Sequence, residues 1–219
     1  SFDIRNGDLV IGDGVKAHGV TVSVDGGSLL VNGTIDASGA APGTIRLSAI
    51  NGLTLVSSAV LDAHGTVLQV DSYGQPIEAV NRGIVELAAT RGMLILSAGA
   101  TIDLSTPNGV PYGEINLNVS RTGETSGDIN INAPGPLNIR GAQSIALNAF
   151  WTYSPTDSAG TIVQDNGDTN PVSATTGYVG MNQVDALSQQ FVTAALANGN
   201  LLGRLAGLTA YSNAFHLRP

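Results

Sequence analysis

The chain has 219 residues, a net charge of −8, nine lysine and arginine residues, and no cysteine. Charged residues make up only 12% of it and aromatic residues 5%, whereas glycine occurs 28 times. An ordinary α/β enzyme carries about twice this share of charge, so the composition disfavours that class and suits short strands joined by tight turns.

The charge and the cysteine content also exclude several kinds of partner. A duplex-binding surface needs clustered lysine and arginine, but the nine basic residues are scattered, so we expect no nucleic-acid partner. No apolar run approaches the ~18 residues of a membrane helix, so no membrane insertion is expected. The lack of cysteine excludes a disulfide scaffold and thiolate metal sites.

A unit of about 20 residues recurs through the first part of the chain. Each copy begins with glycine, alternates apolar and polar residues, and contains three short strands; the copies are residues 19–38, 43–63, 83–104 and 127–149. So short a unit cannot bury its own apolar face, so the copies must stack, strand on equivalent strand. We therefore predict a mostly β fold, a right-handed parallel β-helix (solenoid) over residues 1–150.

Glycines inside the units mark the expected turns of the coil. Gly52, Gly92 and Gly135 follow the first strand of their units, where we expect a positive φ. An antiparallel sandwich is the competing interpretation. It is disfavoured because the units resemble one another and because Asn32-Gly33 and Asn108-Gly109 lie at non-equivalent positions.

Two stretches break the period and are expected to be loop excursions from the rungs, residues 66–82 and 105–126. The first should contain a strand at Val67–Val70 and a turn at Ser72–Pro76. The second should contain an alternating strand at Glu114–Ser120.

Beyond residue 150 the repeat stops. Residues 151–180 are polar and aperiodic, and we expect a long excursion there. A short α-helical appendage is predicted at residues 181–207, with residues 208–219 returning as a strand.

Helical spacing of apolar residues supports the appendage; these are Met181, Val184, Leu187, Phe191 and Ala195. Asn182 is the expected N-cap, Asn198-Gly199 the expected stop, and a second short helix is expected at Leu201–Leu205, ended by Gly207.

An aspartate recurs at the end of three units: Asp36, Asp62 and Asp103. Stacked carboxylates could bind a cation or act as an acid–base pair, whereas an aspartate in a turn usually bonds its own backbone. We favour the second interpretation, because like charges at rung spacing repel and no arginine or histidine recurs with them.

Other site signatures are missing from the sequence. His18, His64 and His216 have no partner at metal-ligand spacing, and no nucleophile elbow or nucleotide fingerprint occurs. We therefore predict no catalytic residues, no cofactor and no metal.

Aromatic residues gather around the long excursion in an otherwise aromatic-poor chain: Trp151, Tyr153 and Tyr178. They are the candidate partner contacts, to a sugar or a protein, although such residues more often seal an insertion against its scaffold.

The closing elements "TIDAS", "VLDAHG" and "TIDLS" resemble the β-helical shaft of filamentous-haemagglutinin-type exoproteins, the secreted partners of two-partner secretion systems. A more specific resemblance, to a large subfamily of these filamentous haemagglutinins, lies in residues 68–83, 139–153, 181–200 and 204–219. The resemblance implies an internal fragment of a far longer adhesin on the bacterial cell surface or released from it.

The resemblance further implies export through an outer-membrane transporter and a surface receptor or glycan as partner. The expected role is a shaft and display scaffold without catalysis. Two alternatives stay open: a polysaccharide-active β-helix enzyme, lyase or glycoside hydrolase, working through the aspartates, or a glycan-binding module working through residues 151–180.

Overall fold

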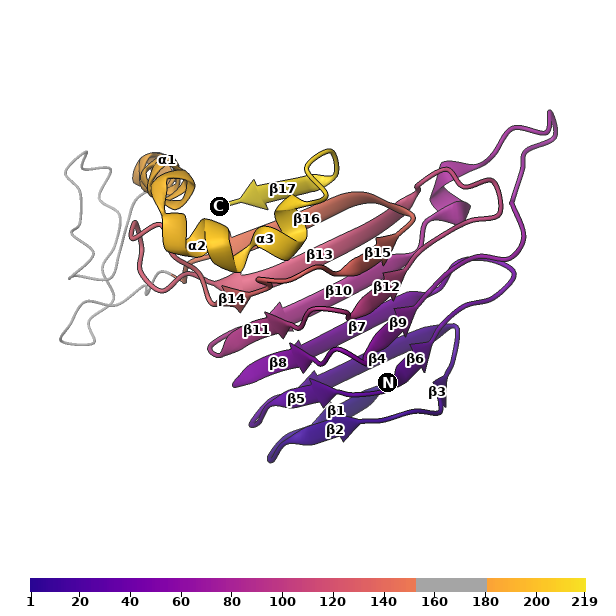
Figure 1. Ribbon diagram of the computed structural model, residues 1–219, viewed down its shortest axis with the longest axis horizontal. Helices are drawn as coiled ribbons and strands as arrows, with labels where there is room; N and C mark the ends of the chain where they lie inside the picture. Colours follow the sequence, from indigo (N-terminus) through magenta and orange to yellow (C-terminus); the bar gives the residue numbers. More distant parts are fainter. Residues whose placement is uncertain (153–180) are drawn as a thin grey trace.

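Three parallel β-sheets, each running along the same axis, make up most of the computed structural model (Figure 1). The structure describes residues 1–152 and 181–219. Sheet A has seven strands: β1 (Phe2–Ile4), β4 (Gly19–Val24), β7 (Thr44–Ala49), β10 (Ile84–Ala89), β13 (Gly113–Ser120), β16 (Ala142–Phe150) and β17 (Phe215–Arg218). Sheet B has five: β2 (Leu9–Ile11), β5 (Leu29–Val31), β8 (Gly52–Leu55), β11 (Met93–Leu96) and β14 (Ile131–Asn132). Sheet C has five: β3 (Val15–Lys16), β6 (Thr34–Asp36), β9 (Val60–Asp62), β12 (Thr101–Asp103) and β15 (Asn138–Arg140).

The chain visits the sheets in the order A, B, C, and each such coil of three strands is one rung of the stack. Every strand pairs in parallel with its counterpart on the next rung. Inward residues stack in register, as Leu47, Leu87 and Leu117 do in sheet A, and these three are fully buried. The predicted parallel β-helix is thereby confirmed.

The rungs coincide with the predicted units at 19–38, 43–63 and 83–104, and one further rung, β1 to β3, precedes them. The unit predicted at 127–149 is out of phase. Its last part, Ile145–Leu147, lies in β16 of sheet A and so opens a rung instead of closing one. The error arose because the apolar–polar alternation before β14 imitates a sheet A strand.

The loops from sheet C back to sheet A vary most in length. Phe2 pairs with Val22, 20 positions along the chain, whereas Leu47 pairs with Leu87, 40 positions along. The register of the strands is unchanged by this variation. Extra residues at this corner are therefore accommodated outside the stack.

The excursion at 66–82 is present, but its predicted strand at Val67–Val70 is wrong. Only an isolated antiparallel bridge joins Val70 to Pro76, and a 3₁₀ helix, η1 (Glu78–Asn81), follows. The strand predicted at Glu114–Ser120 is confirmed as part of β13. Since β13 belongs to the stack, the predicted excursion at 105–126 is in fact two shorter loops on either side of a rung strand.

Two glycines in equivalent turns are required for different reasons. Gly52 has a φ of +133°, as expected for a turn that side chains disfavour. Gly92 and Gly135 have no positive φ, contrary to the prediction. A Cβ atom on Gly92 would instead collide with the Asn51 carbonyl group of the rung below, so close stacking explains this glycine.

Three helices follow: α1 (Met181–Ala197), α2 (Gly199–Arg204) and α3 (Ala206–Thr209). Phe191 and Ala195 are buried as the apolar spacing predicted. Asn182 lies inside α1, so the predicted N-cap there is wrong, while the Asn198 side chain caps α2 through the Leu201 N–H at 3.1 Å. Gly207 lies inside α3 and does not end a helix.

The helices close the end of sheets B and C, and we call residues 181–214 the helical cap (Figure 1). The Ala133 N–H donates to the Arg204 carbonyl at 2.7 Å, and the Gly207 N–H donates to the Ala133 carbonyl at 2.8 Å. The chain then returns to sheet A, where Phe215 of β17 pairs with Ile145 of β16. Thus helices take the place of the next strands in sheets B and C, while sheet A continues.

Candidate functional site

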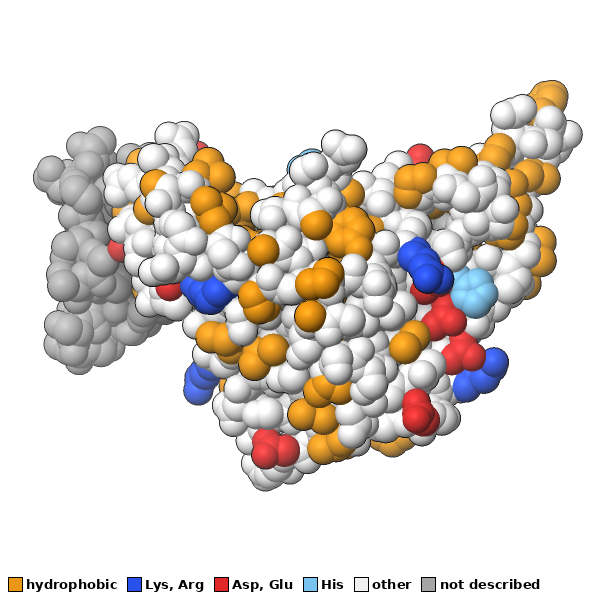
Figure 2. Space-filling view, in the orientation of Figure 1, with side chains coloured by type: hydrophobic (Ala, Val, Ile, Leu, Met, Phe, Trp, Pro, Cys, Tyr) orange, Lys and Arg blue, Asp and Glu red, His pale blue; other side chains and the backbone are white. Residues whose placement is uncertain are grey.

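One column of charged side chains runs along the outer face of sheet C. It consists of five residues in strict register, one per rung: Lys16, Asp36, Asp62, Asp103 and Arg140. Figure 2 shows the acidic side chains in a row, with basic side chains at both ends and a histidine beside them. The three aspartates suspected from the sequence are therefore brought together.

Each aspartate of the column forms a turn with its own backbone. The Oδ1 atoms accept the N–H of the residue two positions later, from Ser38 at 3.0 Å, His64 at 3.1 Å and Ser105 at 2.9 Å. This is the Asx-type turn expected of such a residue. The favoured structural interpretation of the aspartates is therefore confirmed, and the recurrence of aspartate follows from the recurrence of the turn.

Cations offset the stacked negative charge, contrary to the prediction that none recurs with it. Lys16 Nζ lies 2.7 Å from Asp36 Oδ2, and Arg140 Nη1 lies 3.8 Å from Asp103 Oδ2. The hydrogen bond from Lys16, together with bonds from Ser38, lowers the pKa of Asp36 to about 2. The same contact with Asp36 raises the pKa of Lys16.

The middle of the column has a histidine partner. His64 Nδ1 lies 2.6 Å from Asp62 Oδ1, so the carboxylate that is farthest from both end cations has a ring nitrogen beside it. Among residues 1–152 and 181–219, no group of three or more His, Cys, Asp or Glu side chains is placed to hold a metal ion.

The candidate aromatic contacts are only partly described. Trp151 follows the end of β16, and 37% of it is exposed. Tyr153 and Tyr178, like the rest of the predicted excursion at 151–180, lie outside the described residues.

A projecting loop carries the densest group of exposed apolar side chains, and we call residues 66–82 the arm (Figures 1 and 2). The group comprises Val67, Val70, Tyr73, Ile77 and Val80, exposed by 39–88%. Tyr73, at 88%, is the most exposed of them. Single exposed apolar residues are ordinary, but five within one loop make the arm a candidate contact surface.

Hydrogen bonds inside the arm fix its shape. At the tip, Asp71 Oδ1 accepts the N–H groups of Tyr73 and Gln75, both at 2.8 Å. At the base, the fully buried Asn81 side chain accepts the Gln69 N–H at 3.0 Å and donates to the Gln69 carbonyl at 2.9 Å. The apolar side chains are therefore presented on an ordered loop, which lowers the entropy lost on binding.

Sequence reasoning missed the arm and the ends of the column. The signal for the column was present, since Lys16 and Arg140 hold the position in their rungs that aspartate holds in the others. The arm was visible as an excursion, but Val67–Val70 were assigned to a strand and the exposure of the other apolar residues was not predicted.

Comparison with models of protein families, with curated proteins and with solved structures found no match. Within the part of the chain that the structure describes, no helix is long and apolar enough to cross a membrane.

Proposed function

We propose that this chain is a shaft segment of a large secreted bacterial surface protein of the filamentous haemagglutinin type, and that it displays the arm for contact with a surface partner. The observation that carries the proposal is the arm itself, five exposed apolar side chains on a loop held by internal hydrogen bonds. A stable stack supplies the rigid support that such a loop needs.

The direction of the stack supports the role of a shaft. The strands of each sheet follow one another in chain order from β1 to β17, so the chain enters at one end of the stack and leaves at the other (Figure 1). An element of this kind extends a longer protein in series. The lack of cysteine suits a chain exported unfolded through an outer-membrane transporter, since no disulfide could lock a loop.

Adhesion of beads coated with the chain to cultured epithelial cells and to bacterial cells tests the proposal. The double variant Val70→Ser/Tyr73→Ser should reduce adhesion to the level of uncoated beads, because the centre of the apolar group is removed. Leu196→Ser, which alters a side chain 64% exposed on α1, is the matched control and should adhere as the parent does. Adhesion that is absent, or equal in all three proteins, contradicts the proposal.

A polysaccharide-active enzyme is the alternative that the aspartate column permits, and it makes an opposite prediction. Under the scaffold proposal the chain turns over neither acidic nor neutral polysaccharides. Turnover that Asp62→Asn or Asp103→Asn abolishes would establish the enzyme instead.

Glycan recognition near Trp151 is the second alternative, favoured by the exposure of this residue at the end of β16. A glycan array with the parent chain and Trp151→Ala separates it from the scaffold proposal. Signals lost in the variant would assign the role to this aromatic residue.

A further inference from the structure

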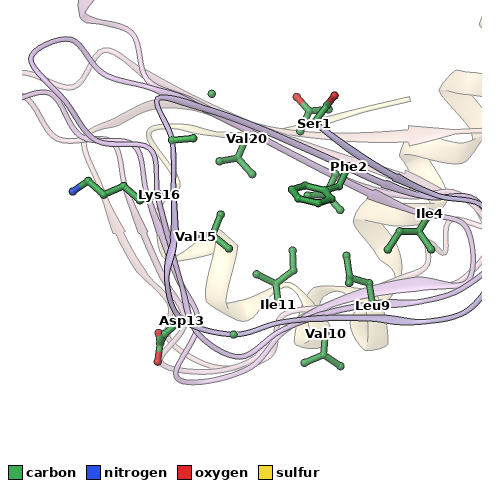
Figure 3. Close-up of a pocket in the computed structure, with 15 residues that line it drawn as sticks. Ser1, Phe2, Ile4, Leu9, Val10, Ile11, Asp13, Val15, Lys16 and Val20 are labelled. Carbon is green, nitrogen blue, oxygen red and sulfur yellow. The ribbon is translucent and has the colours of Figure 1, made fainter.

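The arm carries apolar side chains that packing between rungs does not explain. Apolar residues of the first rung also reach solvent, but Figure 3 shows Phe2, Ile4 and Leu9 directed into one hollow. Their partners on the next rung point into the core, so that hollow belongs to the interior of the stack. The arm instead projects beyond the sheets, and its five apolar side chains stay 39–88% exposed (Figures 1 and 2).

The shape of the arm limits the kinds of partner that it fits. The arm projects from the corner between sheets C and A, and Tyr73 near its tip is 88% exposed. Only a concave surface can enclose a projecting one. Sugar sites have the opposite arrangement, since the protein supplies the pocket and the small ligand enters it. The shape therefore favours a partner with a pocket of its own, which is a protein.

The backbone of the tip is suited to removal from water. Within residues 71–77, five N–H groups are bonded inside the arm at 2.8–3.0 Å, those of Asp71, Tyr73, Gly74, Gln75 and Ile77. A sixth residue, Pro76, has no N–H group. Burial of an unpaired N–H group costs free energy, so a loop whose donors are already paired enters an apolar pocket with a smaller penalty.

The charges of the arm disfavour anionic partners. Arg82 is the only lysine or arginine within residues 66–82. Its guanidinium group is bonded to Glu78 at 2.7 Å and to Glu114 at 2.6 Å. Anionic glycans and lipid headgroups are bound through cations, and the one cation of the arm is already paired. The Asp71 carboxylate at the tip also opposes insertion into a bilayer, whose interior penalises charge.

We propose that the arm inserts residues 70–77 into a preformed apolar pocket of a protein on the partner surface. This inference rests on the proposed function and names the chemistry of the partner that the arm contacts. The pocket takes up the side chains of Val70, Tyr73 and Ile77, while the internal hydrogen bonds keep the tip in one shape. The arm thus binds as a rigid plug.

Adhesion of coated beads to treated cells tests this inference. Proteinase K removes surface proteins from the cells, whereas mild periodate oxidises glycans and spares proteins. Digestion should reduce adhesion about tenfold or more, to the level of the Val70→Ser/Tyr73→Ser variant, because the pocket is lost. Periodate should leave adhesion unchanged. Phosphatidylcholine vesicles, alone or with phosphatidylserine, should not bind the beads.

The outcomes separate this inference from the proposed function. Arm-dependent adhesion that survives digestion, disappears after periodate or extends to vesicles would overturn the protein pocket and leave the display role standing. Adhesion that is absent from untreated cells would contradict the proposed function and this inference together.

A variant with a larger tip distinguishes a shaped pocket from general apolar contact. Val70→Phe enlarges a side chain that is 47% exposed, so the fold should be unchanged, which circular dichroism verifies. A preformed pocket lacks room for the ring, so the coating density for half-maximal adhesion should rise about tenfold. Leu196→Phe, at an exposed position of α1, is the matched control and should adhere as the parent does. Equal or stronger adhesion of Val70→Phe would refute the pocket, because unspecific apolar contact grows with area.

Discussion

The hydroxyl group of Tyr211 donates a hydrogen bond to the carbonyl oxygen of Leu137 at 2.6 Å. The hydroxyl oxygen of Tyr211 also accepts the N–H of Ile139 at 2.9 Å, so one side chain of the helical cap serves both a donor and an acceptor of the sheet C edge. A tyrosine thus does here what the next strand does elsewhere in the stack.

Tyr211→Phe should destabilise the fold by about 1–2 kcal/mol, because a donor and an acceptor at the sheet edge lose their partner. Urea denaturation measures the free energy of unfolding, and the Ile139 amide should exchange faster. Tyr73→Phe, at the exposed tip of the arm, should have no effect. Equal stabilities of the two variants would show that the Tyr211 contact does not stabilise the edge.

Arg204→Met should cost about 2 kcal/mol of unfolding free energy, since the guanidinium group bonds to the carbonyl groups of Ile129 and Ile131, at and beside β14, and to Asp128. Methionine keeps most of the apolar stem, so the loss reports on the polar contacts. Arg91→Met, at an exposed turn, is the control and should change stability little. If both variants unfold at the same urea concentration, the cap is not held through Arg204.

Gly92→Ala should destabilise the stack by about 1–3 kcal/mol, because the new Cβ meets the Asn51 carbonyl group and forces two rungs apart. The matched variant Gly19→Ala adds a Cβ into open space and should stay within about 0.5 kcal/mol of the parent. Thermal or urea unfolding compares them, and a neutral Gly92→Ala would refute close stacking as the reason for this glycine.

Acid should weaken the charged column through Asp36. The pKa of this carboxyl group is lowered from 3.8 to about 2 in the folded chain, so ionisation stabilises the fold above pH ~4. That contribution is lost as the pH falls through about 2. Unfolding free energies should be measured from about pH 5 to about pH 2, which spans the pKa values of the unfolded and folded chain. They should decline less steeply in Asp36→Asn than in the parent. Identical slopes would mean that the bond from Lys16 does not act on stability.

Repetition is what made the fold predictable from sequence. Where inward residues recur at the same place in each unit, as at Leu47 and Leu87, the alternation alone gives strand, face and register. The predicted start of the rung was wrong at residues 127–149. The residues leading into β14 alternate in the same way as a sheet A strand, and this alternation does not distinguish one sheet from another.

The candidate site was harder to predict, because its parts lie far apart in the chain. The three aspartates were found because the same residue recurs at the end of three units. Lys16 and Arg140 differ from it, so their place in the column is recognised only when the rungs are aligned by strand pairing. The arm was missed for a different reason. The exposure of Val70 and Tyr73 depends on how far the loop departs from the stack, which no local pattern encodes.

The corner between sheets C and A has a consequence for protein engineering. Strands β9 and β10 flank the longest loop in this part of the chain. Each nevertheless stays in register with its partner on the preceding rung, β9 with β6 and β10 with β7. Doubling the length of a loop costs only about 0.6 kcal/mol in closure entropy. A foreign peptide grafted between Gln69 and Ile77, whose backbones are joined by a 3.0 Å hydrogen bond, would inherit closely spaced ends and a fixed mount.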